Sequence, residues 1–253
     1  MDLVNKMEID NCRCIFLDTE TTGKSDEGGA AHIGHRVIEI GAVEVVNRKL
    51  TDNNYQCYLN PHRKVDEEAV QVHGITDEFL ADKPDFRDIA DQFIEYIRGA
   101  VLIIHNAKFD VGFLDQELEL NGYKERIEEL CKVVDSYAEA KELLPGHAKY
   151  SLDALSKMFE VQGKYDRSFH GALLDSKILA DVYLAMTGGQ NTMDSMFRAD
   201  MNSAHGDASE DGRLVSEGSL MVLKASEEEL QAHAKKLSSL NKSKTSNWDL
   251  YYL

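Results

Sequence analysis

A short apolar run that ends in two closely spaced carboxylates is the feature that most limits how this chain can fold. Residues 14–17, Cys-Ile-Phe-Leu, are followed at once by Asp18 and, two positions later, by Glu20. Such a run is typical of a buried strand, and residues i and i+2 of a strand point to the same face. Asp18 and Glu20 can therefore offer oxygens to one hard cation. Two solvated carboxylates at a strand end are the alternative interpretation.

Two later segments place further carboxylates beside apolar elements. Residues 101–104 are typical of a buried strand, and Asp110 falls in the first turns of the helix expected after it. Asp175 precedes apolar residues at helical spacing, so we expect it on a helix. Taken singly, Asp175 could be a surface carboxylate, and Asp110 could be a charge favoured by the helix dipole.

His170 lies five positions before Asp175. Residues five apart on one helix diverge by roughly 140°, so the two could not share a helix face. We therefore expect His170 on a mobile loop before the helix. Because imidazole titrates near neutrality, a histidine on such a loop can take a proton from an attacking water. An ordinary loop histidine is the alternative.

These segments resemble the three motifs of the DEDDh superfamily of 3′ to 5′ exonucleases. The matching patterns are Asp18-x-Glu20, His105-Asn106-x-x-Phe109-Asp110 and His170-x4-Asp175. Residues 12–190 and part of the C-terminal region are also similar to the family of proofreading (epsilon) subunits of bacterial DNA polymerase III. That similarity includes residues 37–50, 73–75, 83–84, 96–100 and 173–190.

The resemblance implies a two-metal hydrolytic site. It assigns Asp18, Glu20 and Asp175 to the first metal, with Asp18 bridging to a second. Asp110 would act through water, and His170 would take the proton from the attacking water. Two divalent ions about 4 Å apart stabilise the attacking and leaving oxygens of a phosphodiester, and Mg²⁺ or Mn²⁺ suits oxygen ligands.

Contacts to the terminal nucleotide are expected from backbone amides around the Thr-Thr-Gly segment and from residues that the resemblance adds. These are Thr21, Thr22, Gly23, Glu68, His73, Asn106 and Phe109. His73 could instead be a turn histidine before Gly74. We expect recognition of a frayed single-stranded 3′ end with little sequence preference, because selectivity follows how readily a terminus unpairs.

The order of elements indicates an α/β fold. We expect strands at residues 13–18, 37–46, 55–59, 101–105 and 132–135, and helices at residues 85–98, 107–121, 136–144, 152–159 and 172–186. Short connections predict that the first three strands form an antiparallel meander. This order matches the ribonuclease-H-like exonuclease fold that the resemblance implies, a mixed five-stranded sheet flanked by helices.

We expect three parts in the chain: a domain at residues 1–189, which the resemblance implies is an exonuclease, a linker at 190–212, whose composition indicates flexibility, and a small C-terminal segment at 213–253. Ser226 and Glu229 form a capping-box pattern before a helix expected from about residue 227 to 240. By resemblance, this segment docks on the polymerase alpha subunit. The linker peptide resembles sliding-clamp ligands, although its apolar residues could be chance: Gln190, Met193, Met196 and Phe197.

The formal net charge of −17 is unusual for a protein that binds DNA. Divalent cations would cancel part of it, and we expect the isolated chain to bind DNA weakly and to depend on a polymerase. A small accessory subunit is a further possible partner. No apolar run is long enough for a membrane span, and the N-terminus lacks the apolar core of a secretion signal, so we expect a cytoplasmic protein. The four cysteines lack zinc-ligand spacing and are expected to be reduced.

Two other functions share these features. An RNA-trimming DEDDh exonuclease of the ribonuclease T or oligoribonuclease type would carry the same motifs. A catalytically silent scaffold could use the same fold to bridge a polymerase and a clamp. The linker and tail favour the proofreading subunit, and the presence of all five catalytic residues argues against the scaffold.

Overall fold

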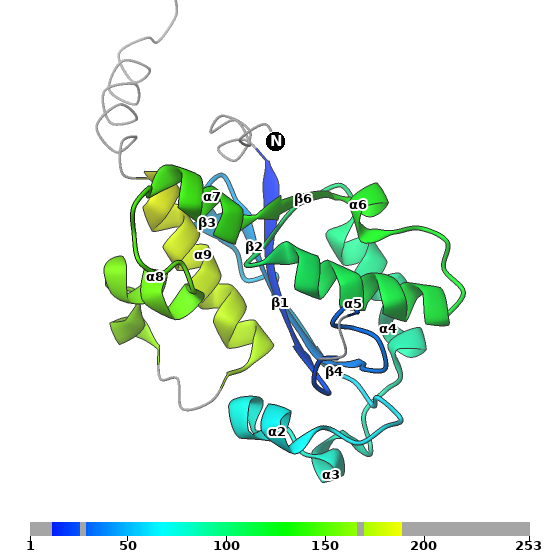
Figure 1. The fold of residues 1–253 in the computed structure, drawn as a ribbon. Helices are drawn as coiled ribbons and strands as arrows, with labels where there is room; N and C mark the ends of the chain where they lie inside the picture. The colour runs from blue at the N-terminus through cyan, green and yellow to red at the C-terminus, as the bar shows by residue number, and fades with distance from the viewer. Residues whose placement is uncertain (1–11, 26–28, 166–169, 189–253) are drawn as a thin grey trace, which may run out of the picture. The chain divides into compact units, whose positions relative to one another are not determined.

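The computed structural model describes residues 12–25, 29–165 and 170–188. Its sheet is six-stranded, with the order β3-β2-β1-β5-β6 and with β4 beside β2 (Figure 1). The strands are β1 (Arg13–Thr21), β2 (Val37–Val46), β3 (Lys49–Leu50), β4 (Tyr55–Tyr58), β5 (Val101–Ile104) and β6 (Lys132–Asp135). β2 pairs antiparallel with β1 and β4, whereas β5 pairs parallel with β1 and β6. The predicted meander and the mixed sheet are confirmed.

The sheet has one strand more than the five that we predicted. β3 is only two residues long and follows a tight turn at Asn47 and Arg48, both of which have positive φ angles, 52° and 60°. Two successive residues with positive φ form the hairpin turn that matches strand twist. Arginine is not a typical residue for that turn, so this hairpin has little signature in the sequence.

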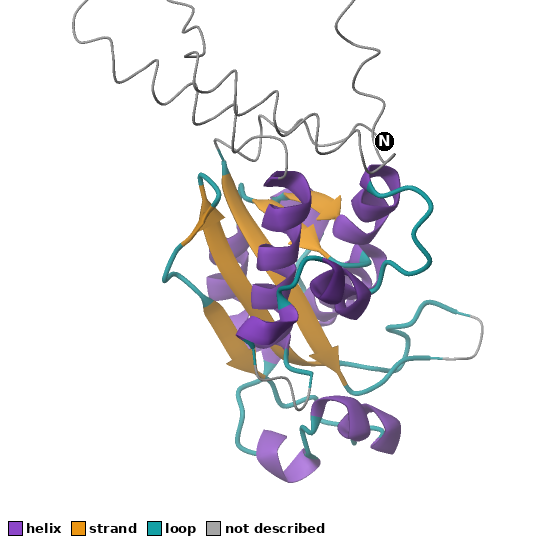
Figure 2. Cartoon of the chain, turned by 90° about the vertical axis from the view of Figure 1, so that its left-hand side faces the viewer, coloured by secondary structure: helices purple, strands orange, loops and turns teal. Residues whose placement is uncertain are grey.

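The helices within the described residues cover both faces of the sheet (Figure 2). They are α2 (Glu67–His73), α3 (Asp77–Leu80), α4 (Phe86–Ile97), α5 (Ala107–Leu120), α6 (Ile127–Leu130), α7 (Ser136–Leu143), α8 (Leu152–Met158) and α9 (Ala172–Gly188), with a 3-10 turn at Gln162–Lys164. All five predicted helices are present. The short helices α2, α3 and α6 were not predicted.

The central strand β1 is apolar along its run because both of its faces are covered. Ile15 and Leu17 belong to the core beneath α4 and α5, whereas Phe16 belongs to the core beneath α9. Phe16 meets Tyr183 of α9 edge to face, with ring centroids 5.5 Å apart. Alternation along the strand therefore directs Asp18 and Glu20 to the α9 side and Thr19 to the α5 side.

The short helices α2 and α3 lie beyond the carboxyl end of β1 (Figure 1). They pack around a small apolar cluster of Ile38, Val65, Ile75 and Leu80. The Asp66 amide donates to Thr22 O at 2.9 Å, and the His170 amide donates to Val72 O at 3.2 Å. α2 is thus tied both to the end of β1 and to the segment before α9.

Two further predictions concern membrane spans and cysteines. Among the described residues, no helix is both long enough and apolar enough to cross a bilayer. All four cysteines are free thiols; Cys14 and Cys131 are buried in the core, and Cys12 and Cys57 are half-buried.

Candidate active site

The candidate catalytic residues gather at the carboxyl end of the parallel strands. Leu17 pairs with Ile104, and Ile104 pairs with Asp135, so β1, β5 and β6 end at the same edge of the sheet. Asp18 follows Leu17 at this edge, and α5 starts three residues after Ile104. In open α/β sheets this edge is where ligands usually bind.

Glu20, His170 and Asp175 form a group that could hold a metal ion. One ligand atom of each lies within 4.8 Å of the others. Glu20 comes from β1. Asp175 comes from α9 and is 3% exposed. His170 lies outside the helix and just before it, as predicted, and its Nδ1 lies 3.1 Å from Asp175 Oδ2.

Asp18 lies where several carboxyl groups converge. Burial raises the pKa of Asp18 well above its ordinary value, and repulsion from Asp110, Glu20, Asp175 and Glu39 raises it further. A cation bound among these groups would favour the ionised forms and relieve the repulsion. The donors are mostly carboxylate oxygens, which fits a hard divalent cation.

Asp110 reaches the site from the opposite face of β1. It is the fourth residue of α5 and is 4% exposed. Its Oδ1 accepts hydrogen bonds from the Thr19 amide at 3.1 Å and from Thr19 Oγ1 at 2.6 Å. Burial raises the pKa of Asp110 to about 7 despite these hydrogen bonds, which favour the ionised form.

The turn from β5 into α5 sets the direction of Asp110. Asn106 adopts a left-handed conformation, with φ 67° and ψ 55°, which asparagine tolerates better than most residues. The Asn106 amide donates to Asp135 Oδ1 at 3.1 Å, and the same oxygen accepts the Tyr137 amide at the start of α7. Asp135 therefore joins the starts of α5 and α7 beside the site.

A pocket of about 320 Å³ adjoins the candidate metal site. It brings together Glu20 and five of the residues predicted to contact the nucleotide. The lining residues are Glu20, Thr21, Gly23, Lys24, Asp66, Glu68, Ala69, Val72, His73 and Phe109. Glu20 is thus shared between the metal-ligand group and the pocket wall.

Two predicted contact residues lie outside this lining. Thr22 is fully buried; its amide donates to Arg36 O at 2.9 Å, and its hydroxyl accepts the Arg36 amide at 3.0 Å. Asn106 lines a separate cavity of about 940 Å³, which shares Phe109 with the first pocket. The predicted clamp peptide, Gln190, Met193, Met196 and Phe197, lies outside the described residues, as do the linker and the C-terminal segment.

His73 has the geometry of a turn histidine and also lies in the pocket wall. It is the last residue of α2, before the left-handed Gly74, and its Nδ1 accepts the Ile75 amide at 3.0 Å. It also lines the pocket. Burial lowers the pKa of His73, which keeps its ring neutral near pH 7.

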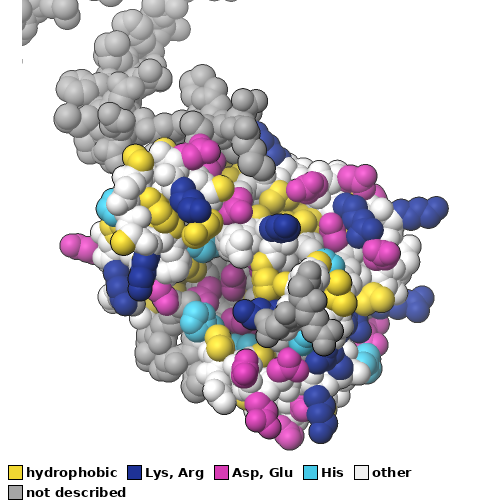
Figure 3. Space-filling model, viewed as in Figure 1, with side chains coloured by type: hydrophobic (Ala, Val, Ile, Leu, Met, Phe, Trp, Pro, Cys, Tyr) yellow, Lys and Arg dark blue, Asp and Glu magenta, His cyan; other side chains and the backbone are white. Residues whose placement is uncertain are grey.

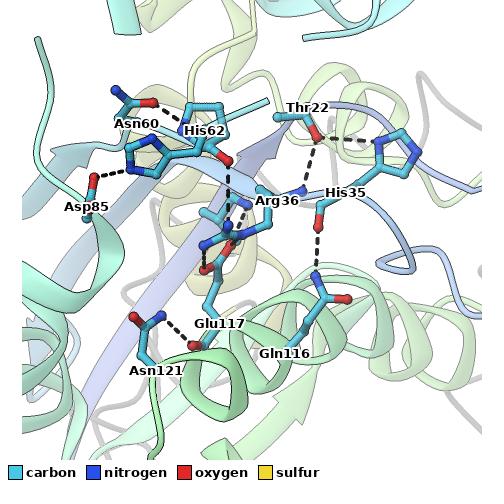
Figure 4. A network of polar contacts seen from close by, with 11 residues as sticks. Thr22, His35, Arg36, Asn60, His62, Asp85, Gln116, Glu117 and Asn121 are labelled. Atoms are coloured by element: carbon cyan, nitrogen blue, oxygen red, sulfur yellow. Dashed lines mark hydrogen bonds and ion pairs between the residues drawn. The ribbon is translucent and has the colours of Figure 1, made fainter. Parts of the chain in front are cut away.

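The segment between β1 and β2 is held at its C-terminal end, just before β2, by an ion pair with a buried carboxylate (Figure 4). The Arg36 Nε and Nη2 atoms both donate to the Glu117 carboxylate at 2.7 Å, and Glu117 is 1% exposed. The Val37 amide donates to Glu117 Oε1 at 3.1 Å. Gln116 Nε2 donates to His35 O at 2.7 Å, which adds a second tie from α5.

Sequence reasoning missed several residues of the site. Thr19 binds Asp110, Lys24 and Asp66 line the pocket, and Glu39 stands opposite Glu20 in the β1–β2 ladder. The strand alternation could have placed Thr19 toward α5, whereas Glu39 required the register between two strands. Acidic side chains gather in the recess between α9 and α5 (Figure 3).

The model of the family described as Exonuclease matches residues 15–183, a span that contains all five candidate catalytic residues. The chain therefore belongs to the exonuclease family. Among solved structures, exonuclease X in complex with 5′ overhanging duplex DNA is 27% identical, covers 71% of this chain and 92% of that chain, and has a TM-score of 0.52. The nuclease domain of 3′hExo, a DEDDh family member, is 20% identical, with a TM-score of 0.57 over 71% of this chain and 94% of that chain, and it shows the shared fold.

Curated relatives identify a narrower group within the exonuclease family. The DNA polymerase III subunit epsilon of Salmonella typhimurium (strain LT2) is 52% identical over 234 residues, 91% of this chain and 94% of the relative. The same subunit of Escherichia coli (strain K12) is 51% identical, with the same coverage. Similarity at this level groups the chain with these subunits and supports its assignment as a 3′ to 5′ exonuclease. The predicted family and fold class are confirmed, and the fold implies divalent metal ions.

Proposed function

We propose that this chain removes nucleotides, mispaired ones above all, from the 3′ end of DNA as the proofreading subunit of a replicative polymerase. One observation carries the proposal. Glu20 lies both in the candidate metal-ligand group with His170 and Asp175 and in the wall of a pocket large enough to take a nucleotide. A terminal phosphodiester next to that pocket would lie beside the metal ligands.

The residues divide the chemistry between them. Asp18, Glu20 and Asp175 would hold a first divalent ion, Asp18 would also bind a second, and Asp110 would act through water. Divalent ions held there, Mg²⁺ or Mn²⁺, would activate the attacking water and stabilise the leaving oxygen. The converging carboxylates around Asp18 support this donor set, because a bound cation would favour the ionised form of Asp18 and offset its repulsion by the neighbouring carboxylates.

His170 takes the proton from the attacking water. Its Nδ1 lies 3.1 Å from Asp175 Oδ2, which fixes the orientation of the ring. Because 43% of its side chain is exposed, the imidazole can also pass the proton to solvent.

The pocket receives the terminal nucleotide. Glu68 and His73 of α2 and Phe109 of α5 form its walls, and Thr21 brings β1 to it. Phe109 offers a ring against which a base can stack. A single unpaired nucleotide has to enter, so a mismatched terminus, which frays more readily, is removed faster than a paired one.

The choice between DNA and RNA rests on the relatives rather than on the geometry. The relatives that match nearly the whole chain are subunits of a DNA polymerase, which supports DNA as the substrate. The polymerase alpha subunit, the sliding clamp and an accessory subunit are proposed partners, through residues 213–253 for the polymerase and residues 190–197 for the clamp. A net charge of −17 supports weak DNA binding by the isolated chain.

The test is hydrolysis of a 5′-labelled single-stranded DNA oligonucleotide by the full-length chain. Activity should vanish with a chelator and return with Mg²⁺ or Mn²⁺. Asp18→Asn, Glu20→Gln and Asp175→Asn should each keep less than about a tenth of the rate, because each removes a metal ligand.

The matched control is Asp181→Asn, which changes a second carboxylate of α9 that binds Lys164 rather than the site. It should stay active. More than a tenth of normal activity in Asp18→Asn would refute the site assignment. Faster hydrolysis of RNA than of DNA would favour the RNA-trimming alternative, and an inactive wild-type chain would favour the scaffold.

A further inference from the structure

Glu39 is a buried carboxylate that neither the motifs nor the proposed chemistry uses. It lies on β2, is 1% exposed and pairs with Glu20 across the β1–β2 ladder. We propose that Glu39 is a positioning residue, which holds the first turn of α9 so that His170 and Asp175 meet the carboxylates of β1. This inference rests on the proposed catalytic roles of His170 and Asp175.

The first contact is a tertiary cap on α9. Glu39 Oε2 accepts the Ala172 amide at 3.1 Å, although the two residues are 133 positions apart. Ala172 is the first residue of α9, whose early amides have no partner within the helix. A carboxylate is also favoured at this end by the helix dipole.

A second contact fixes the same turn on the same strand. Ser176 Oγ lies 2.8 Å from Gly41 O and 2.8 Å from Ala172 O. Gly41 allows the close approach, because a Cβ there would lie 2.0 Å from the Leu173 amide nitrogen. α9 is thus docked on β2 at Glu39 and Gly41, the residues opposite Glu20 and Asp18.

Glu39 is itself held in place from the other side. Its Oε1 accepts Gln56 Nε2 at 2.8 Å, and Gln56 Nε2 also lies 3.2 Å from Tyr58 OH. Both of these residues are on β4. The two Glu39 oxygens are therefore engaged by β4 and by α9, which indicates that the side chain acts on the helix rather than as a metal ligand.

The docked turn carries both functional groups of this segment. His170 precedes Ala172 by two residues, and the Asp175 amide donates to Gly171 O at 2.9 Å. A shift of the turn would move the His170 ring and the Asp175 carboxylate together relative to Glu20. Misplacement by about 1 Å can cost about 10² in rate.

Glu39→Ala is the variant that tests the role. It should lower kcat on the single-stranded oligonucleotide about 10- to 100-fold, the range seen when a partner of a metal ligand is removed. KM should change by less than about threefold, because the pocket residues of β1, α2 and α5 remain. Glu39→Gln should keep at least about a third of kcat, since its amide oxygen can still accept the Ala172 amide and Gln56 can turn its own amide around.

The matched control is Glu44→Ala. Glu44 is on the same strand, is 8% exposed and binds Arg13, Thr51 and Asn53, none of which belongs to α9. Its loss should lower the melting temperature but leave kcat unchanged at a temperature where the variant is folded. If Glu39→Ala does not fold, Ser176→Ala removes the second contact and should lower kcat in the same direction.

Two results would overturn the inference. Equal kcat values for the folded Glu39→Ala and Glu44→Ala variants would show that Glu39 only stabilises the fold. Equal losses of kcat in Glu39→Gln and Glu39→Ala, with weaker Mg²⁺ dependence in both, would show that Glu39 contributes through its negative charge rather than by positioning α9. Asp18→Asn is measured in the same assay; if it stays active, the proposed function fails instead.

Discussion

Two roles are open to His170, that of a general base and that of a metal ligand, because its ring lies close to both Glu20 and Asp175. A general base and a metal ligand make different predictions. As a base, His170→Ala should lower kcat by about 10²- to 10⁴-fold. Mn²⁺ should raise the melting temperature of the wild-type chain, because a ligand bound to the folded state stabilises it, and His170→Ala should keep this rise.

Thermal unfolding with and without Mn²⁺, alongside turnover, measures both effects. Glu20→Gln is the comparison, since the loss of a ligand should remove the Mn²⁺ shift as well as the activity. His147→Ala, an exposed histidine of the loop after α7, should change neither. If His170→Ala loses the Mn²⁺ shift, the imidazole is a ligand and the proposed division of roles is wrong.

At the residue scale, the sequence identified what local spacing can encode. Asp18 and Glu20 share a strand face, and Asp110 and Asp175 follow helix starts, so their placement depends on neighbours in the chain. Glu39 could not be found in this way, because its importance depends on register with β1 and on a contact 133 positions away. Thr22 looked available to a nucleotide, yet both its amide and its hydroxyl bind Arg36.

At the element scale, α5 holds the last residues of the segment between β1 and β2. Glu117 of α5 binds Arg36 through two hydrogen bonds and also accepts the Val37 amide (Figure 4). Glu117→Ala should lower the free energy of unfolding by about 3 kcal/mol, near the lower limit for breaking a buried pair, because Arg36 is partly exposed and can regain water. Urea unfolding followed by circular dichroism measures the loss.

The control for this pair is on the same helix. Glu119 binds Arg126 at 2.8 Å, but both side chains are largely exposed. Glu119→Ala should cost no more than about 1 kcal/mol, the upper value for a surface pair. Similar losses in the two variants would mean that burial of Glu117 gives the connection no special stability.

The longest helices were predicted from the sequence, and the shortest were not. Helices α4, α5 and α9 run over 12, 14 and 17 residues, which is long enough to show apolar residues at helical spacing. Helices α3 and α6 have four residues each and show no period, so only their contacts with the rest of the fold reveal them. α2 has seven residues, the same length as the predicted α8, and it was missed although it supplies one wall of the pocket.

At the scale of the whole molecule, the described residues hold the sheet, its two covering layers and all five candidate catalytic residues. The segments expected to bind the polymerase and the clamp follow residue 189. Catalysis and assembly should therefore be separable. A fragment of residues 1–189 keeps every described element, so it should fold and degrade single-stranded DNA at close to the full-length rate.

The same division predicts opposite binding behaviour for the two parts. A fragment of residues 190–253 should bind the polymerase subunit without cleaving DNA, and residues 1–189 should not bind it. Replacing Met193 and Phe197 by alanine in the full chain should weaken clamp binding selectively, because such peptides anchor through a few apolar side chains. Pull-down of each fragment with polymerase and with clamp measures this. Polymerase binding by residues 1–189, together with none by residues 190–253, would place the assembly surface on the exonuclease domain and contradict the division.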